Sequence, residues 1–261
     1  MVLTSMQLAI GSGNIDLVRL FLDNGAGVNW TFGLNQTSPL QWAIASRNID
    51  VVRLLLQYGA SQDHINALGW SPMFFCWPLT RQGEPLMLEY IKLLAEDSYQ
   101  DLTLLDEDGW NCLHRVAAFG SAAELMQLVK LGADPLAKSL PLGWNALQHA
   151  CFYGNVSCYE ELLPQFEGEA ASMTDERRWT LLHLAAASGT EGLMRDLLKR
   201  GADPEALTNP SVAETIHKDL SGKRCSPRDI AAIEGPEHAL KFDRAIEDLI
   251  ADDEIFFDAE E

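Results

Sequence analysis

Basic residues are scarce in this chain of 261 residues, which has 19 Lys and Arg against 38 Asp and Glu and a formal net charge of −19. A surface that meets the phosphates of nucleic acid or of anionic lipid needs clustered Lys and Arg. The composition therefore argues against binding of DNA, RNA or a membrane surface. It favours a basic or apolar protein or peptide as the partner, unless the charge serves solubility alone.

Cysteine is also infrequent, and its arrangement excludes two common uses. The five residues are odd in number and contain no Cys-x-x-Cys pair, which argues against a disulfide framework and against a zinc site. We interpret them as reduced, buried thiols of a cytoplasmic or nuclear protein. These cysteines are Cys76, Cys112, Cys151, Cys158 and Cys225.

Long apolar runs are missing as well. No segment approaches the roughly 20 apolar residues of a membrane span. The first residues, Met1-Val-Leu-Thr-Ser5, lack the basic start and apolar stretch of a signal peptide. We therefore expect an intracellular protein that does not insert into a membrane.

Signatures of catalysis are absent too. The chain has no Gly-x-Ser-x-Gly elbow and no phosphate-binding glycine-rich loop. Asp106 and Asp108 form a carboxylate pair, but pairs are expected by chance in so acidic a chain. His149 does not share the i, i+4 helical spacing of a metal site with Cys112 or Cys151. The sequence therefore assigns no catalytic residue, no cofactor and no metal ligand.

A period of about 34 residues runs through the chain. Trp110 and Trp144 are 34 residues apart, and Trp179 follows after 35 more. The Gly-Ala pairs that begin at Gly25 and Gly59 are also 34 residues apart. A fixed period of this size indicates an array of stacked structural repeats.

Four segments carry a recurring signature: Gly109-Trp-Asn-Cys-Leu-His114, Arg178-Trp-Thr-Leu-Leu-His183 and the Gly-Ala-Asp-Pro segments 132–135 and 201–204. These segments resemble the ankyrin-repeat family. The resemblance covers nearly the whole chain and implies an all-α solenoid of stacked helix-turn-helix units with short β-turn fingers. It also implies that His114 and His183 hydrogen-bond the turns and tie neighbouring repeats, as could Gln41 and Gln148 at the equivalent place.

We expect seven repeats in one solenoid over residues 1–251, followed by an acidic tail over 252–261. Repeat three carries an insertion near Pro78–Pro85. The first repeat is incomplete, and Met6, Leu8 and Ile10 do not form a polar cap, so either the chain is a fragment or something covers this end. The tail carboxylates disfavour a packed helix, whereas Phe256 and Phe257 are expected to fold back on the last repeat. The expected repeats are 1–29, 30–62, 63–104, 105–137, 138–173, 174–207 and 222–251.

Aromatic residues supply the candidate partner-binding site. In ankyrin proteins the residue after the turn glycine lies on the concave side, near the finger tips, and Trp and Tyr are frequent in binding hot spots. The alternative is that these rings pack on neighbouring turns and stiffen the array. The candidate residues are Trp70, Trp110, Phe119, Trp144, Phe152, Tyr153 and Trp179.

The function that the sequence favours is a non-catalytic protein–protein interaction module, which binds a partner segment on its concave aromatic and acidic surface. One alternative is an enzyme or small-molecule binder, with an aromatic-lined pocket closed by the repeat-three insertion. Another is the substrate-recognition part of a larger protein such as a ubiquitin ligase. The sequence leaves the oligomeric state open.

Overall fold

The structure, a computed structural model, describes residues 5–76, 86–95, 102–166, 168–209 and 222–257, with backbone alone for 86–87 and 251–257. The contacts divide the chain into two compact units, residues 1–134 and 135–261, called unit 1 and unit 2 here. The insertion expected at Pro78–Pro85 lies outside the described residues. Each unit is helical, and strand-like pairing in the described residues is limited to isolated bridges such as Phe32 with Thr37.

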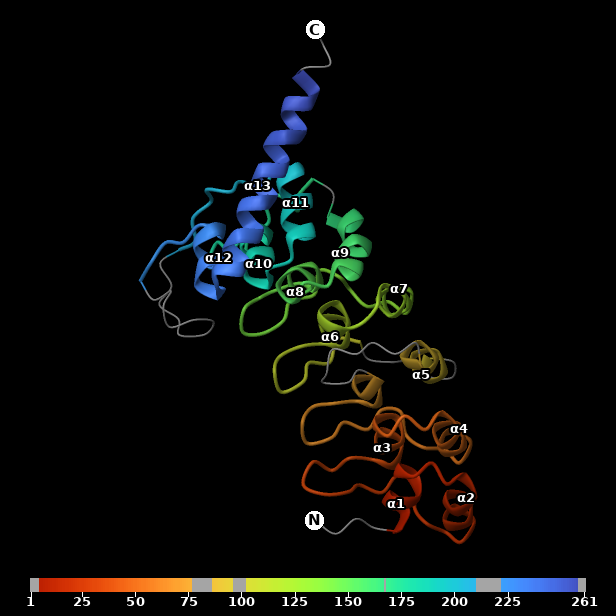
Figure 1. The fold of residues 1–261 in the computed structure, drawn as a ribbon. Coiled ribbons are helices and arrows are strands. Elements are labelled where there is room, and N and C mark those ends of the chain that lie inside the picture. The colour runs from red at the N-terminus through yellow and green to blue at the C-terminus, as the bar shows by residue number, and fades with distance from the viewer. Residues whose placement is uncertain (1–4, 77–85, 96–101, 167, 210–221, 258–261) are drawn as a thin grey trace. The chain divides into compact units, whose positions relative to one another are not determined.

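Unit 1 consists of pairs of antiparallel helices, and the first helices line up beside one another, as do the second helices (Figure 1). Its first helices are α1 (Ser5–Gly11), α3 (Pro39–Ala45), the 3-10 helix η1 (Pro72–Cys76) and α6 (Cys112–Phe119). Its second helices are α2 (Ile15–Asp23), α4 (Ile49–Gln57), α5 (Leu86–Ala95) and α7 (Ala122–Lys130).

Unit 2 repeats the arrangement, with α10 between α8 and α12 and with α11 against α13. Its first helices are α8 (Ala146–Tyr153), α10 (Leu181–Ser188) and α12 (Pro227–Glu234). Its second helices are α9 (Val156–Leu162), which continues as the 3-10 helix η2 (Leu163–Phe166), α11 (Glu191–Lys199) and α13 (Pro236–Phe257). The all-α, stacked helix-turn-helix architecture predicted from the period is thus confirmed.

Five of the first helices begin with the same device, a reciprocal capping box. The N-cap side chain accepts a hydrogen bond from the backbone N–H three residues later, and the side chain at that later position accepts one from the N-cap N–H. The two interactions satisfy amides that a helix start leaves without partners. The pairs are Ser38–Gln41, Asn111–His114, Asn145–Gln148, Thr180–His183 and Ser226–Asp229.

Small side chains allow the first helices to pack closely. Ala117 in unit 1 and Ala150, Ala185 and Ala231 in unit 2 are each 0% exposed. The second helices bury larger aliphatic residues, such as Leu125 on α7. Within each unit, this division of small and large residues forms the apolar core between stacked helix pairs.

Two elements differ from the sequence expectation. The first helix of repeat three is the short 3-10 helix η1, which is consistent with Pro78, because a proline disfavours the helical conformation of the residue before it. The last helix, α13, runs to Phe257 and so crosses the expected boundary at residue 251. Extending an existing helix is far less costly than starting one, despite the carboxylates of Asp252–Glu254. The side chains of Phe256 and Phe257 lie outside the described ones.

Within the described part of the chain, no helix is both long and apolar enough to cross a lipid bilayer.

Candidate partner-binding site

An Asx residue closes the finger of repeat four. The backbone N–H of Asp106 donates to the carbonyl oxygen of Trp110 over 2.8 Å. The Asp106 Oδ1 atom accepts from the backbone N–H groups of Asp108 at 3.0 Å and of Trp110 at 2.9 Å. A short polar side chain that bonds its own turn in this way fixes the conformation of that turn. The finger therefore sets the position of Trp110 locally.

The same turn recurs in the fingers of repeats three and six. Asn66 Oδ1 accepts from the N–H of Trp70 at 3.0 Å, and Asp175 Oδ1 accepts from the N–H of Trp179 at 2.8 Å. An Asn or Asp four residues before the Trp is the common signal. This spacing is visible in the sequence and would have predicted the turn.

In unit 1, the guanidinium of Arg115 is held against the repeat-four finger. Its Nε and Nη2 atoms donate to Asp106 Oδ2 over 2.8 and 2.6 Å, and Nη2 also donates to Asp108 Oδ2 over 2.6 Å. The Asp106 side chain is 0% exposed and that of Arg115 is 12% exposed, whereas that of Asp108 is 62% exposed. The buried carboxylate thus has a fixed countercharge, and the outer carboxylate remains open to solvent.

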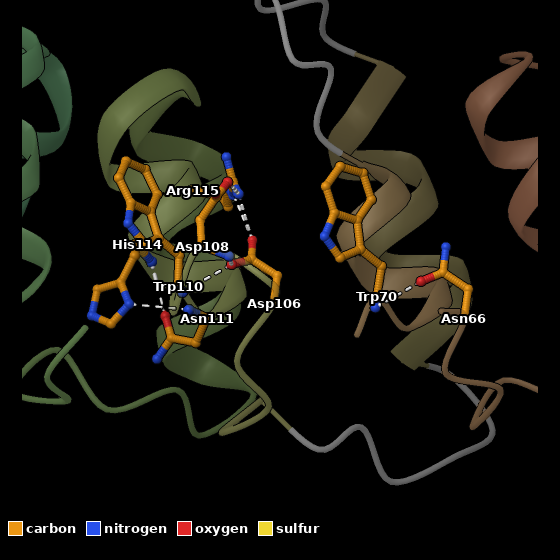
Figure 2. A network of polar contacts seen from close by, with 8 residues as sticks. All are labelled: Asn66, Trp70, Asp106, Asp108, Trp110, Asn111, His114 and Arg115. Carbon is orange, nitrogen blue, oxygen red and sulfur yellow. Dashed lines mark hydrogen bonds and ion pairs between the residues drawn. The ribbon is translucent and has the colours of Figure 1, made fainter. Parts of the chain in front are cut away.

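Arg115 also joins two fingers through their indole rings (Figure 2). Its Cζ atom is 4.8 Å from the centroid of the Trp110 ring and 5.8 Å from that of the Trp70 ring. Both distances fall within the range of cation–π attraction. Because the guanidinium is also fixed by Asp106, the two tryptophans of unit 1 are held in register.

Further aromatic rings extend this surface in unit 1. Phe119, at the end of α6, stacks on Trp110 with 6.3 Å between centroids. Phe75 meets Trp70 edge to face with 5.4 Å between centroids. All four residues are half-buried, so each keeps part of its surface exposed to solvent. We call Trp70, Phe75, Trp110 and Phe119, with Arg115 and Asp108, the finger surface.

Unit 2 also places an arginine near two finger tryptophans, but these tryptophans are buried. The Arg177 Cζ atom is 5.7 Å from the Trp144 ring centroid and 5.3 Å from that of Trp179, and Arg177 forms an ion pair with Asp175. Here, however, the Trp144 Nε1 atom donates to Asp175 Oδ2 over 2.9 Å. Trp144 is 2% exposed and Trp179 is 3% exposed. These two rings serve the packing of unit 2 and offer almost no surface to a partner.

The remaining predicted aromatic residues of unit 2 lie at the end of α8. Phe152 and Tyr153 are half-buried and meet edge to face with 5.1 Å between centroids. Phe152 also packs on Trp144, with 5.0 Å between centroids. They form a smaller aromatic patch than the finger surface.

Gln41 and His183 make the hydrogen bonds between repeats that the resemblance implied, whereas the buried Nε2 atom of Gln148 has no hydrogen-bond partner among the described residues. Gln41 Nε2 donates to the carbonyl oxygen of Trp70 over 2.7 Å, and His183 Nε2 lies 3.0 Å from the carbonyl oxygen of Cys225. Each bond joins a first helix to the next finger in the same unit. Burial lowers the pKa of His183, which favours the neutral form of the ring. His149 is buried and lies 2.9 Å from Ser139 Oγ.

The thiols have no sign of nucleophilic activation. All five cysteines are free and buried. Burial raises the pKa of the Cys76 and Cys151 thiols well above the usual range, so both are protonated at neutral pH. In the segments that the structure describes, no group of three or more His, Cys, Asp or Glu side chains is placed to hold a metal ion.

A separate hollow of about 660 Å³ lies in unit 2, between α9–η2 and α11. Its lining includes Tyr159, whose hydroxyl donates to Asp196 Oδ2 over 2.7 Å, and Arg200 Nε, which donates to the same oxygen over 2.7 Å. Burial, and then this hydrogen bond, raises the pKa of Tyr159 far above its ordinary value. Gly192 leaves open space on α11, because a Cβ atom there would meet nothing within 4 Å.

Two human proteins are similar in sequence to part of this chain. Human inhibitor of Bruton tyrosine kinase is 37% identical over 70 residues, which are 27% of this chain and 5% of that protein. Human protein phosphatase 1 regulatory subunit 27 is 31% identical over 90 residues, which are 34% of this chain and 57% of that protein. The chain therefore spans only part of the relatives it matches.

Similarity to a solved structure and to a family model covers most of the chain. The crystal structure of the ankyrin repeat domain of Bcl-3 superimposes with a TM-score of 0.62 and 24% identity, covering 87% of this chain and 93% of that one. The family model described as ankyrin repeats, three copies, matches residues 3–77 and 113–208. The chain belongs to the ankyrin-repeat family.

Proposed function

We propose that this protein is a protein-interaction module that binds a partner polypeptide at the finger surface of unit 1. The observation that carries the proposal is the position of Arg115 between Trp70 and Trp110. Because the rings are fixed before a partner arrives, binding loses little side-chain entropy. Rigid, half-buried aromatic residues of this kind supply most of the binding energy in many interfaces.

Charge around the finger surface favours a basic partner segment. Asp106, Glu107 and Asp108 supply three carboxylates in one turn, and Arg115 supplies one cation, which leaves two negative charges. Glu107 and Asp108 are exposed. A segment that places Lys or Arg against this turn and an apolar side chain against the rings would match both features.

The names of the two proteins that match part of this chain are consistent with a protein-interaction role. One is called an inhibitor and another a regulatory subunit, and both words describe proteins that act on other proteins. What those proteins bind is not transferred to this chain, because each match covers a short segment.

Site-specific photo-crosslinking tests the location of the interface. A photoreactive phenylalanine analogue at Phe119 should give a crosslinked partner, whereas the same analogue at exposed Lys130 on α7 should not. The crosslinked segment is then synthesised and titrated against the purified protein. Equal crosslinking at both positions would contradict the proposed surface.

A matched pair of substitutions gives the energetic test. Phe119→Ala should weaken binding of that segment by at least tenfold, because it removes one ring of the finger surface. Leu240→Ala, at a position that is 51% exposed on α13, should leave the affinity unchanged. Circular dichroism of both variants checks that the helices are retained.

The hollow of unit 2 supports a second candidate function, the binding of a small molecule. Its volume of about 660 Å³ falls within the range of ligand sites, and Tyr159, Asp196 and Arg200 supply polar groups beside apolar walls. A thermal-shift screen of metabolites should then yield a ligand whose effect is abolished by Gly192→Leu, a substitution that fills the hollow. A ligand whose effect survives Gly192→Leu would bind elsewhere.

A further inference from the structure

Two successive fingers of unit 2 end in basic residues. The finger of repeat six ends with Arg177 and Arg178, and that of repeat seven ends with Lys223 and Arg224. Arg178 and Arg224 each lie two positions before the N-cap of the following first helix, so they occupy equivalent places in their repeats. In a chain with 19 basic residues against 38 acidic ones, these two turns depart from the overall charge.

Hydrogen bonds hold the two fingers against each other. The backbone N–H of Asn209, in the finger of repeat seven, donates to the carbonyl oxygen of Arg177 over 2.8 Å. The N–H of the next residue back, Thr208, donates to the carbonyl oxygen of Cys225 over 3.1 Å. Because Arg224 directly precedes Cys225, these bonds bring the basic residues of both fingers onto neighbouring segments of the backbone.

The backbone at Arg178 has a conformation that suits glycine. Its φ is 61°, and glycines with φ between 64° and 75° occupy the equivalent position in repeats three, four and five. Glycine adopts such angles without a steric cost, whereas arginine does not. Residues held in unfavourable backbone conformations are concentrated at functional sites. Since the Arg178 side chain is exposed, packing does not explain why an arginine stands here.

Three carboxylates beside these fingers are engaged or directed elsewhere. Asp175 forms an ion pair with Arg177. The Glu176 Oε1 atom lies 3.7 Å from the place of a Cβ atom at Gly143, so it faces the finger of repeat five. Asp229 closes the capping box of α12. Among the described residues, three exposed side chains of these fingers form no ion pair, and we call them the basic edge: Arg178, Lys223 and Arg224.

We propose that the basic edge binds an acidic segment of another polypeptide, in which several Asp or Glu side chains lie close together. Guanidinium groups hold carboxylates through parallel charge-assisted hydrogen bonds. Complementary charge also steers association and fixes the register of a bound segment. A long polyanion such as nucleic acid fits less well, because the basic edge covers two fingers of a molecule with a net charge of −19.

Fluorescence anisotropy of a labelled, Glu-rich peptide tests the charge of the partner. At low ionic strength this peptide should bind the whole 261-residue chain, and a peptide with Gln in place of each Glu should not. Added salt should weaken the binding, because the three cations are exposed. Absence of binding by the Glu-rich peptide would overturn the proposal, as would tighter binding of a single-stranded DNA of equal charge.

Arg178→Gly locates the peptide on the basic edge. It introduces the residue of the equivalent turns in repeats three to five, so the thermal midpoint should stay the same or rise. The affinity for the Glu-rich peptide should fall about fivefold, as for the loss of a favourable exposed ion pair, and Arg224→Ala should weaken it by a similar factor. Lys130→Ala removes an exposed positive charge from α7 in unit 1 and should leave the affinity unchanged. Equal losses for Arg178→Gly and Lys130→Ala would overturn the proposal, because the peptide would then respond to total charge alone.

One more variant separates the basic edge from the finger surface. Phe119→Ala should leave the affinity for the Glu-rich peptide unchanged, because Phe119 belongs to unit 1. Loss of peptide binding in Phe119→Ala but not in Arg178→Gly would place the peptide on the finger surface and overturn the proposal. The partner of the finger surface is tested by its own crosslinking experiment, so either surface can fail without the other.

Discussion

The indole nitrogen of Trp144 donates a hydrogen bond to the Oδ2 atom of Asp175 over 2.9 Å, and both side chains are buried. The bond joins two successive fingers of unit 2. In unit 1 the corresponding link is made by Arg115, which lies between Trp70 and Trp110 and leaves both rings half-buried. The same residue type after the finger turn therefore packs the array in one unit and lines a surface in the other.

Trp144→Phe should destabilise the protein by about 1–3 kcal/mol, because Asp175 then loses a buried hydrogen-bond donor. Urea denaturation followed by circular dichroism measures the change. Asp175→Asn should cost a similar amount, and the double variant should cost less than the sum, as expected for residues in direct contact. Strictly additive losses would mean that the indole–carboxylate bond contributes nothing.

Arg115→Met should lower the free energy of unfolding by about 3 kcal/mol, because it leaves the buried Asp106 carboxylate without its countercharge. Arg53→Met is the matched control. Arg53 pairs with Glu89, and both side chains are nearly half exposed, so the loss should stay below about 1 kcal/mol. Equal losses for the two variants would contradict the structural role of Arg115.

Gly189→Ala should be more damaging than Gly201→Ala. Both glycines have left-handed backbone angles, with φ of 64° and 87°, and an alanine at such a position costs about 1–2 kcal/mol. At Gly189 the new Cβ would also lie 1.6 Å from Cδ2 of His238, whereas at Gly201 it would meet nothing within 4 Å. His238→Ala should recover part of the loss in the Gly189→Ala background. The thermal midpoints of Gly189→Ala, Gly201→Ala and the double variant Gly189→Ala with His238→Ala measure these losses.

Stability should fall below about pH 6.5 partly because of His183. Burial lowers the pKa of this ring in the folded state below its ordinary value of 6.5. As the pH decreases, the unfolded chain therefore binds the proton first, and stability is lost from about pH 6.5 down to the folded pKa. His183→Gln should remove this contribution and keep the capping box, since Gln41 and Gln148 cap their helices in the same way. Urea unfolding of both proteins at a series of pH values gives the difference; parallel curves would refute the assignment.

Deletion of residues 252–261 should lower the thermal midpoint, if Phe256 and Phe257 cover the last repeat as the sequence predicts. Each phenylalanine gains roughly 1.5–3 kcal/mol when it is buried. Deletion of residues 258–261 alone keeps both rings and should leave the midpoint in place. A midpoint that is unchanged by the longer deletion would show that the phenylalanines do not contribute to the fold.

Several features of the fold could be predicted from the sequence because their causes are local. The 34-residue period fixed the stacking of helix pairs, and the polar residue three positions before Gln41, His114 and His183 marks the start of a helix. Of the local signals, the Asx residue four positions before Trp70, Trp110 and Trp179 was overlooked.

The exposure of each tryptophan was decided by tertiary structure alone. Trp70, Trp110, Trp144 and Trp179 share one position in the repeat, yet Trp144 and Trp179 are buried. Their burial depends on which side chain of another repeat meets the ring, and Asp175 lies 31 residues from Trp144. A repeating sequence determines the position of a side chain within its own turn, because that turn closes with its own hydrogen bonds. It does not determine what the neighbouring repeat places against that side chain, because this contact forms only when the repeats stack.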